Sequence, residues 1–435
     1  MAPLALGGLF WSWFVTPART ALWIGFLSGV TYFAIMCSWF AVTAAGLVGP
    51  FGFLTVLGPA IIEAVSFALA AVAASIVYAR APSVLGPLAA AAAFTVFEWL
   101  RSVGALGMPF AQIGYSQVGD PFAAFAAYGG SIFVTFVVAA VGALLASVAQ
   151  DPQRMPRVAI ALVAIGCATV AANIFWPARH APPATIPVSA IQGNIKQDVK
   201  WDPRTFLLSF QRYARMTESA GATHPAFVLW PETVMTALIG DDDRLPSKDV
   251  RAVQQFRDRL GALASHTRAT IAVGALEQSS DGLHNALYFF KPNGQLDDIY
   301  RKRQLVPYAE WVPYGRRLLA WFPYLDELGK QVPGREPLVV DDGALRIAPL
   351  ICWESAFSDV VQDQIAQGAT LLAIATDDGW FGESAGPFQH AQIAQMRAIE
   401  TGRWVLRAAA TGVSGIIAPD GRWMERAGLD RQAIT

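Results

Sequence analysis

Hydrophobic residues crowd the first 176 positions of this 435-residue chain, where polar side chains are sparse. Six apolar stretches are separated by short polar or proline-containing segments, and most approach the roughly 20 residues that a helix needs to cross a bilayer core. They cover residues 4–15, 21–44, 52–78, 83–100, 121–148 and 157–176. The pattern predicts a multi-pass α-helical membrane domain over residues 1–176.

The pattern changes after Trp176. Prolines at positions 177, 182, 183 and 187 predict a short, stiff connector over residues 177–187. Short apolar runs then alternate with longer amphipathic segments over residues 188–435. Buried strands are expected at 188–192, 226–230, 270–273, 286–290, 345–351 and 370–375, and helices at 203–219, 247–265, 357–367 and 387–402. This alternation predicts an α/β domain in which helices cover sheets.

The arginines between the apolar stretches predict an orientation. Cytoplasmic loops of membrane proteins carry an excess of Lys and Arg. If residues 188–435 lie outside the cytoplasm, Arg19, Arg80, Arg154 and Arg157 face the cytoplasm and Arg101 faces outward. The four-to-one ratio therefore predicts an external α/β domain.

Overall composition excludes some function classes. Hydrophobic residues make up 54% of the chain, and the mean hydropathy is +0.39. The net charge of −1 leaves no basic footprint for nucleic acid. The five histidines show no metal-ligand spacing. Two of the three cysteines, Cys37 and Cys167, lie in apolar stretches, so no disulfide framework is predicted.

The third cysteine, Cys352, directly follows the apolar run 345–351. A cysteine attacks carbonyl groups as a thiolate, which requires a base and a positive group for the developing oxyanion. Glu232 follows another apolar run and can be the base if a dry site raises its pKa toward neutrality. Lys302 can supply the positive charge. Each residue alone has an ordinary structural explanation: a buried core cysteine, a turn glutamate and a solvated lysine.

The local sequences around these residues are more specific in combination. Together they resemble the nitrilase superfamily, and within it the apolipoprotein N-acyltransferase family. The resemblance rests on Gln192–Ile195, Lys200–Asp202, Trp230–Glu232, Tyr300–Pro313, Cys352–Glu354 and Asp378–His390, with Phe97–Arg101 and Gly114–Gln117 in the apolar half. It implies a four-layer αββα sandwich over residues 188–435.

The resemblance also implies roles for individual residues. Cys352 is expected to be the nucleophile, Glu232 the general base and Lys302 the oxyanion stabiliser. Four further positions are expected to support them, namely Trp201, Glu310, Trp353 and Glu354. Trp353 stands where the family usually has tyrosine, and Asp377 stands where it usually has asparagine.

The activity implied is transfer of an acyl chain from a glycerophospholipid to the N-terminal α-amine of a diacylglyceryl-cysteine lipoprotein, through a thioester, at the external side of the bacterial inner membrane. Neither a cofactor nor a metal is implied. By the same resemblance, we expect the chain to lack the family's first and last membrane helices and the C-terminal part of the catalytic domain.

Three alternatives stay open. Water could replace the amine in a membrane-anchored amidase or nitrilase, although six apolar stretches exceed what an anchor needs. An inactive relative could bind only lipid or lipoprotein, although the Glu-Lys-Cys set is intact. Finally, His390 could pair with Cys352 as a Cys-His dyad.

Overall fold

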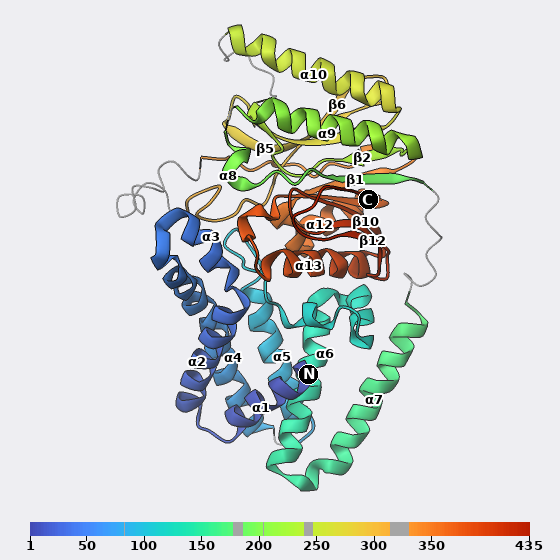
Figure 1. The fold of residues 1–435 in the computed structure, drawn as a ribbon. Coiled ribbons are helices and arrows are strands. Elements are labelled where there is room, and N and C mark those ends of the chain that lie inside the picture. The colour runs from blue at the N-terminus through green and yellow to red at the C-terminus, as the bar shows by residue number, and fades with distance from the viewer. Residues whose placement is uncertain (82, 177–185, 203, 239–246, 314–329) are drawn as a thin grey trace. The chain divides into compact units, whose positions relative to one another are not determined.

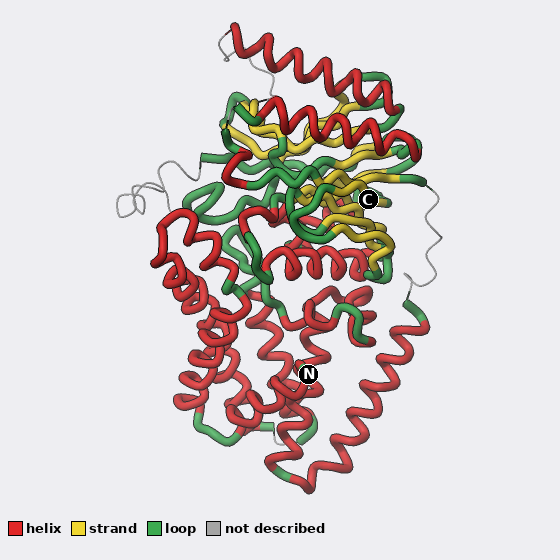
Figure 2. Tube along the Cα trace, viewed as in Figure 1, coloured by secondary structure: helices red, strands yellow, loops and turns green. Residues whose placement is uncertain are grey.

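The computed structural model describes residues 1–81, 83–176, 186–202, 204–238, 247–313 and 330–435. Most of the predicted connector, residues 177–185, lies outside this range. Two compact units form: residues 1–180 with 381–402, and residues 181–380 with 403–435. The sequence places residues 381–402 in the α/β domain, whereas the structure groups them with the helical unit. Figure 2 shows strands only in the α/β unit.

The first unit is helical, as the hydrophobic pattern predicts (Figure 1). Among the described residues, four helical segments are long and apolar enough to cross a membrane, and two shorter apolar helices accompany them. The predicted span 21–44 is divided in two at Cys37 and Ser38. The main helices are α1 (Ala2–Phe14), α2 (Ala18–Met36), α3 (Trp39–Val48), α4 (Leu57–Arg80), α5 (Leu85–Leu100), α6 (Ala126–Gln150), α7 (Met155–Ile174) and α13 (Gly386–Thr401).

Small residues let α2 and α4 approach closely. A Cβ atom on Gly25 would lie 2.6 Å from the Ala71 Cβ atom, and one on Gly29 would lie 2.9 Å from the Ala64 Cα atom. Apolar helices in a bilayer gain little from hydrophobic burial against one another, so close backbone packing of this kind stabilises their association. Gly25 and Gly29, four residues apart, therefore hold this helix pair together.

Polar contacts link several chain segments of the helical unit. The Arg154 guanidinium donates to the Tyr78 hydroxyl at 2.6 Å, and the Ser75 hydroxyl donates to the Thr16 carbonyl at 3.0 Å. Arg154 thus ties the turn before α7 to the end of α4. Arg101 is held elsewhere, by Glu98 and by the carbonyl oxygens of residues 108 and 110. Arg154 and Arg101 are thus held by different parts of the helical unit.

The second unit contains two β-sheets. The first has the strand order β13-β1-β2-β4-β5-β6, with β3 paired to β4, and the second has the order β12-β11-β10-β9-β8-β7. The first comprises β1 (Val188–Gln192), β2 (Phe227–Leu229), β3 (Met235–Leu238), β4 (Thr270–Gln278), β5 (Leu283–Phe290), β6 (Leu296–Arg301) and β13 (Ala433–Ile434). The second comprises β7 (Val340–Asp341), β8 (Arg346–Ile351), β9 (Leu371–Thr376), β10 (Trp404–Ala409), β11 (Ser414–Ile417) and β12 (Trp423–Ala427).

Apolar side chains hold the sheets and helices of the second unit together in layers. One buried cluster joins the two sheets, with Phe227 and Leu287 from the first and Ile347 and Leu406 from the second. A second cluster packs α9 (Phe206–Ala220) and α10 (Ser247–Thr267) on the outer face of the first sheet. On the second sheet, α12 (Ser358–Ala366) is tied to β8 by the Gln364 side chain, which donates to the Pro349 carbonyl at 2.6 Å. The predicted α/β sandwich is confirmed.

Parallel pairing brings several strand ends together. Strand β2 runs parallel to β1 and β4, and β9 runs parallel to β8 and β10. Residues that follow parallel strands project from one edge of a sheet, where α/β proteins usually bind ligands. Glu232 and Cys352 both occupy such positions.

Gly274 on β4 allows a close approach to the Pro231–Glu232 turn. A Cβ atom there would collide with the Pro231 carbonyl oxygen and lie 2.7 Å from the Glu232 Cα atom. We predict that Gly274→Ala lowers the free energy of unfolding by about 1–3 kcal/mol, because the backbone must shift. Thermal unfolding would measure the loss. Gly166→Ala is the control, since nothing lies within 4 Å of its Cβ position, and equal midpoints for both variants would contradict the prediction.

Candidate active site

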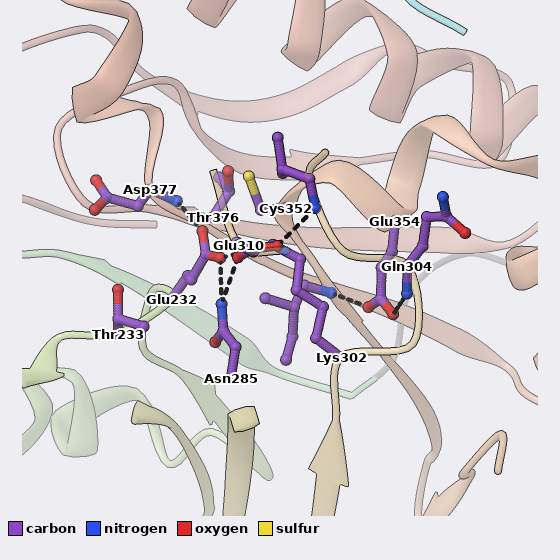
Figure 3. A network of polar contacts seen from close by, with 12 residues as sticks. Glu232, Thr233, Asn285, Lys302, Gln304, Glu310, Cys352, Glu354, Thr376 and Asp377 are labelled. Carbon is purple, nitrogen blue, oxygen red and sulfur yellow. Dashed lines mark hydrogen bonds and ion pairs between the residues drawn. The ribbon is translucent and has the colours of Figure 1, made fainter. Parts of the chain in front are cut away.

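The candidate catalytic side chains follow the ends of strands from both sheets. Glu232 follows β2, Lys302 directly follows β6, and Cys352 directly follows β8. Figure 3 shows the three side chains gathered in one place, with Glu310, Asn285 and Thr376 around them. The structure thus brings together the three residues that the sequence assigned to the triad.

Lys302 lies at the centre of the site with only 1% of its surface exposed. Its ammonium donates to Glu232 Oε1 at 3.0 Å and to Glu310 Oε1 at 2.8 Å. Burial alone would lower the pKa of Lys302, but the negative charges of Glu232 and Glu310 raise it well above its ordinary value. Lys302 is therefore a permanent cation.

Glu232 is held through both carboxylate oxygens. Besides Lys302, Oε1 accepts from the Asn285 side-chain amide at 2.7 Å. Oε2 accepts from the Asp377 backbone N–H at 2.9 Å. These contacts fix the rotation of the carboxylate, so its position relative to the other site residues is set before any ligand arrives.

The charge state of Glu232 differs from the sequence-based expectation. Burial acts to raise the pKa of Glu232, but the nearby ammonium groups of Lys302 and Lys200 outweigh it, and the pKa is lowered. The expectation of a pKa raised toward neutrality is wrong, because a dry site that contains two lysines favours the carboxylate. Glu232 is therefore ready to accept a proton in the resting protein.

Cys352 occupies a strained turn at the end of β8. Its φ angle of +51° lies in the left-handed region, which is uncommon for residues other than glycine and is concentrated at functional sites. Burial, with the negative charge of Glu232, raises the pKa of the Cys352 thiol well above its ordinary value, although Lys302 acts to lower it. The resting nucleophile is thus a neutral thiol beside an ionised carboxylate.

Comparison with known proteins identifies the family. Residues 187–435 match the carbon-nitrogen hydrolase family model, and residues 1–144 match the model of the apolipoprotein N-acyltransferase N-terminal domain. The apolipoprotein N-acyltransferase of Pseudomonas paraeruginosa is 33% identical over 96% of this chain and 81% of that protein. The chain belongs to the apolipoprotein N-acyltransferase family. The resemblance inferred from the sequence is confirmed.

Other relatives agree over a similar range. The apolipoprotein N-acyltransferase of Methylococcus capsulatus is 34% identical over 100% of this chain and 85% of that protein. That of Haemophilus ducreyi is 30% identical over 98% and 83%. A solved carbon-nitrogen hydrolase superfamily structure from Xanthomonas campestris is 20% identical, with a TM-score of 0.43, and covers 58% of this chain and 90% of that one. Family membership and the apolar helices make this a membrane protein.

Glu310, one of the predicted supporting residues, lies beside Lys302 in the candidate site. Its Oε1 accepts from Lys302 and, at 3.2 Å, from Asn285, while Oε2 accepts from the Val306 backbone N–H at 2.8 Å. Glu310 therefore anchors the loop after β6 to the ammonium. Together with Glu232, it places two carboxylates around one lysine.

Glu354 connects the turn at Cys352 (the cysteine turn) to the loop that begins at Lys302 after β6 (the lysine loop). Its fully buried carboxylate accepts from the Ile351 backbone N–H at 2.7 Å and from the Tyr300 hydroxyl at 2.9 Å. It also accepts from the backbone N–H groups of Arg303 and Gln304, at 2.5 and 3.2 Å (Figure 3). The residues on either side of Lys302 and the residue before Cys352 thus share one acceptor, which fixes their relative positions.

The two predicted tryptophans occupy different environments. Trp353 is 6% exposed, and its ring centroid lies 6.0 Å from that of Phe357. Trp201 is 46% exposed, with the Lys200 ammonium 5.6 Å from its ring centroid. Trp353 is therefore buried near Phe357, whereas Trp201 presents an aromatic surface.

His390 was predicted as a possible partner of Cys352, whereas Asn285 and Thr376 were not predicted to belong to the site. His390 lies on α13 of the helical unit, where its ring is 5.7 Å from that of Phe110. Asn285 and Thr376 were missed, because a single amide or hydroxyl on a buried strand has no signature beyond polarity. Among the described residues, no group of three or more His, Cys, Asp or Glu side chains could hold a metal ion.

We predict that Glu354→Gln lowers the free energy of unfolding by about 1–3 kcal/mol, because an amide nitrogen would face backbone donors that need an acceptor. It should also slow alkylation of Cys352, since the turn would lose its tie to the lysine loop. Thermal unfolding and peptide mass mapping after iodoacetamide treatment would measure these effects. Glu336→Gln, at an exposed position, is the control, and a Glu354→Gln variant that matches it in both measurements would refute the assigned role.

Proposed function

We propose that this chain transfers an acyl chain from a glycerophospholipid to the N-terminal α-amine of a diacylglyceryl-cysteine lipoprotein, with Cys352 as the covalent carrier. The enzyme class is that of the family, an N-acyltransferase. The observation that carries the proposal is the meeting of Cys352, Glu232 and Lys302 in one buried site. Such a site supplies a nucleophile, a base and a cation for an oxyanion.

In the first half-reaction, Cys352 Sγ attacks the ester carbonyl carbon while its proton passes to Glu232. The carbonyl oxygen becomes an oxyanion. An ammonium has three N–H donors, and Lys302 directs two of them to carboxylates. The third can donate to the oxyanion. As the tetrahedral intermediate collapses, the C–O bond breaks, Glu232 returns the proton to the leaving glycerol oxygen, and a lysophospholipid departs from the thioester.

The second half-reaction uses the same groups. The lipoprotein amine attacks the thioester carbon and loses a proton to Glu232, while Lys302 again faces the oxyanion. The C–S bond breaks, an amide forms, and the proton returns to the Cys352 sulfur. Because both intermediates carry an oxyanion at one position, a fixed cation serves both steps.

The proposed location is the bacterial inner membrane, with the α/β unit at the external face. Support comes from Arg154, whose contact with Tyr78 places two of the basic chain segments at one end of the helical unit. In this orientation the site lies on the side where lipoprotein N-termini are exposed, and the bilayer supplies the phospholipid donor.

We predict that Cys352→Ser and Glu232→Gln each reduce acyl transfer by about 10²-fold or more, the range typical when a nucleophile's base or its thiolate is lost. The assay would follow conversion of a diacylated lipopeptide to its triacylated form in proteoliposomes. Cys167→Ser is the matched control, since Cys167 lies exposed on α7. A Cys352→Ser variant with control-level transfer would exclude the covalent route, and release of free fatty acid without transfer would indicate a hydrolase.

A second prediction concerns orientation. A reporter inserted after residue 190 should be external, and one inserted at residue 153 should be cytoplasmic, because the arginines favour that arrangement. Paired fusions to alkaline phosphatase and green fluorescent protein would measure this. A cytoplasmic reporter at residue 190 would contradict the proposed access of lipoproteins to the site.

A further inference from the structure

A second buried lysine contacts the Glu232 turn. Lys200, at the end of α8 (Gln197–Lys200), is 4% exposed. Its ammonium donates to the Thr233 hydroxyl at 2.8 Å, to the Glu232 backbone carbonyl at 3.2 Å and to the Asp377 carboxylate. All three donors of the ammonium are used, and two of them hold the backbone segment that carries the general base.

The segment held by Lys200 is strained. Thr233 has a φ angle of +46°, which is unfavourable for a β-branched residue. Such conformations persist only where surrounding contacts determine them. Lys200 supplies two of those contacts, one to the carbonyl before the strained residue and one to the strained side chain itself.

Asp377 acts on the same carboxylate in two ways. Its backbone N–H donates to Glu232 Oε2 at 2.9 Å, while its side chain accepts from Lys200 and, at 2.8 Å, from Gln197. The side chain is 2% exposed. The Asp377 backbone therefore orients Glu232 Oε2, and the Asp377 carboxylate offsets the charge of the Lys200 ammonium.

The charges around Glu232 show what this pair does. The groups that face it are Lys302 after β6, Glu310 in the following loop, Cys352 after β8, Lys200 from α8 and Asp377 after β9. Without Asp377, two lysines would offset Glu232 and Glu310, and the cluster would be neutral. With Asp377 ionised, the cluster keeps one surplus negative charge, which favours proton uptake by Glu232.

We infer that the buried Lys200–Asp377 ion pair is a positioning device for the general base, in which Lys200 fixes the strained Glu232–Thr233 turn and Asp377 offsets the charge of Lys200. The inference rests on the proposed function, because it assigns the pair to the base of that reaction. Both residues act through Glu232 and not on the substrate.

The test uses Asp377→Asn, Lys200→Met and the double variant in the full chain. Release of lysophospholipid from a synthetic diacyl glycerophospholipid, without acceptor, is measured against pH. Removing the anion stabilises the Glu232 carboxylate, so Asp377→Asn should move the acidic midpoint of the rate to lower pH by about 1 unit. Lys200→Met removes a positive charge near Glu232, so it should move the acidic midpoint of the rate to higher pH by a similar amount. The double variant should return it toward the starting value, with a rate about 10-fold or more below that of the unmodified chain, because the turn is no longer held.

Controls separate this inference from the proposed function. Asp420→Asn breaks a surface ion pair in the same unit and should change nothing. If Lys200→Met fails to fold because Asp377 is left as an unpaired buried charge, the double variant and Asp377→Asn still decide the outcome. Cys352 alkylation by iodoacetamide provides a second midpoint without substrate, and the single variants should shift it in opposite directions as well.

Coincident midpoints in all variants, or shifts in the same direction for both single variants, would overturn the inference. If the unmodified chain releases no lysophospholipid while the alkylation midpoints move oppositely, the proposed function fails and the charge-offset role remains.

Discussion

A buried ammonium shared by two carboxylates is the constraint on which the catalytic unit depends. Lys302 contacts Glu232 and Glu310 at 3.0 and 2.8 Å, and all three groups are largely removed from water. Unpaired, any of them would be costly to bury. Strands from two sheets must therefore end where these groups can meet, and Asn285 and Glu354 must supply the remaining hydrogen bonds that hold the loops in place.

The same interaction determines the resting charge of the site. Burial, with the negative charge of Glu232, raises the pKa of the Cys352 thiol, although Lys302 acts to lower it. Glu232 stays ionised because Lys302 and Lys200 stabilise its charge. In the proposed reaction, proton transfer from sulfur to Glu232 would be unfavourable until a carbonyl group is bound and its oxygen can take up the negative charge beside Lys302. The proposed site would therefore react only when an ester is bound.

The sequence predicts strands β1, β2, β4, β5, β8 and β9, because these are continuous apolar runs, but it misses the buried strand β10. Strands β8 and β9 are buried on both faces and were predicted within one residue. Strand β6 was missed, since Asp297 and Asp298 interrupt its apolar pattern and Tyr300 alone is buried among its six residues. Strand β12 was missed for the same reason, with three exposed residues in its centre. Edge and near-edge strands have weaker hydrophobic signals than central ones.

The sequence indicated that Glu232, Lys302 and Cys352 belong together, but not the electrostatics of the candidate site. Apolar runs predicted as strands precede Glu232 and Cys352, whereas Lys302 was found from its local sequence, because β6 before it was not predicted. The direction of the Glu232 pKa shift was not predictable, since it depends on how closely Lys302 and Lys200 approach this residue in the folded chain, where they outweigh its burial. The strained φ angle of Cys352 is likewise a property of the folded β8 turn and has no counterpart in the sequence pattern.

The central claim is that one cysteine carries the acyl chain between donor and acceptor. Intact-mass spectrometry of the chain, after incubation with a phospholipid of defined acyl length, tests this claim most directly. We expect a mass increase equal to one acyl group, mapped to Cys352, which disappears when a lipopeptide with a free N-terminal amine is added. An unmodified chain that nonetheless transfers acyl groups, or an adduct at another residue, would contradict it.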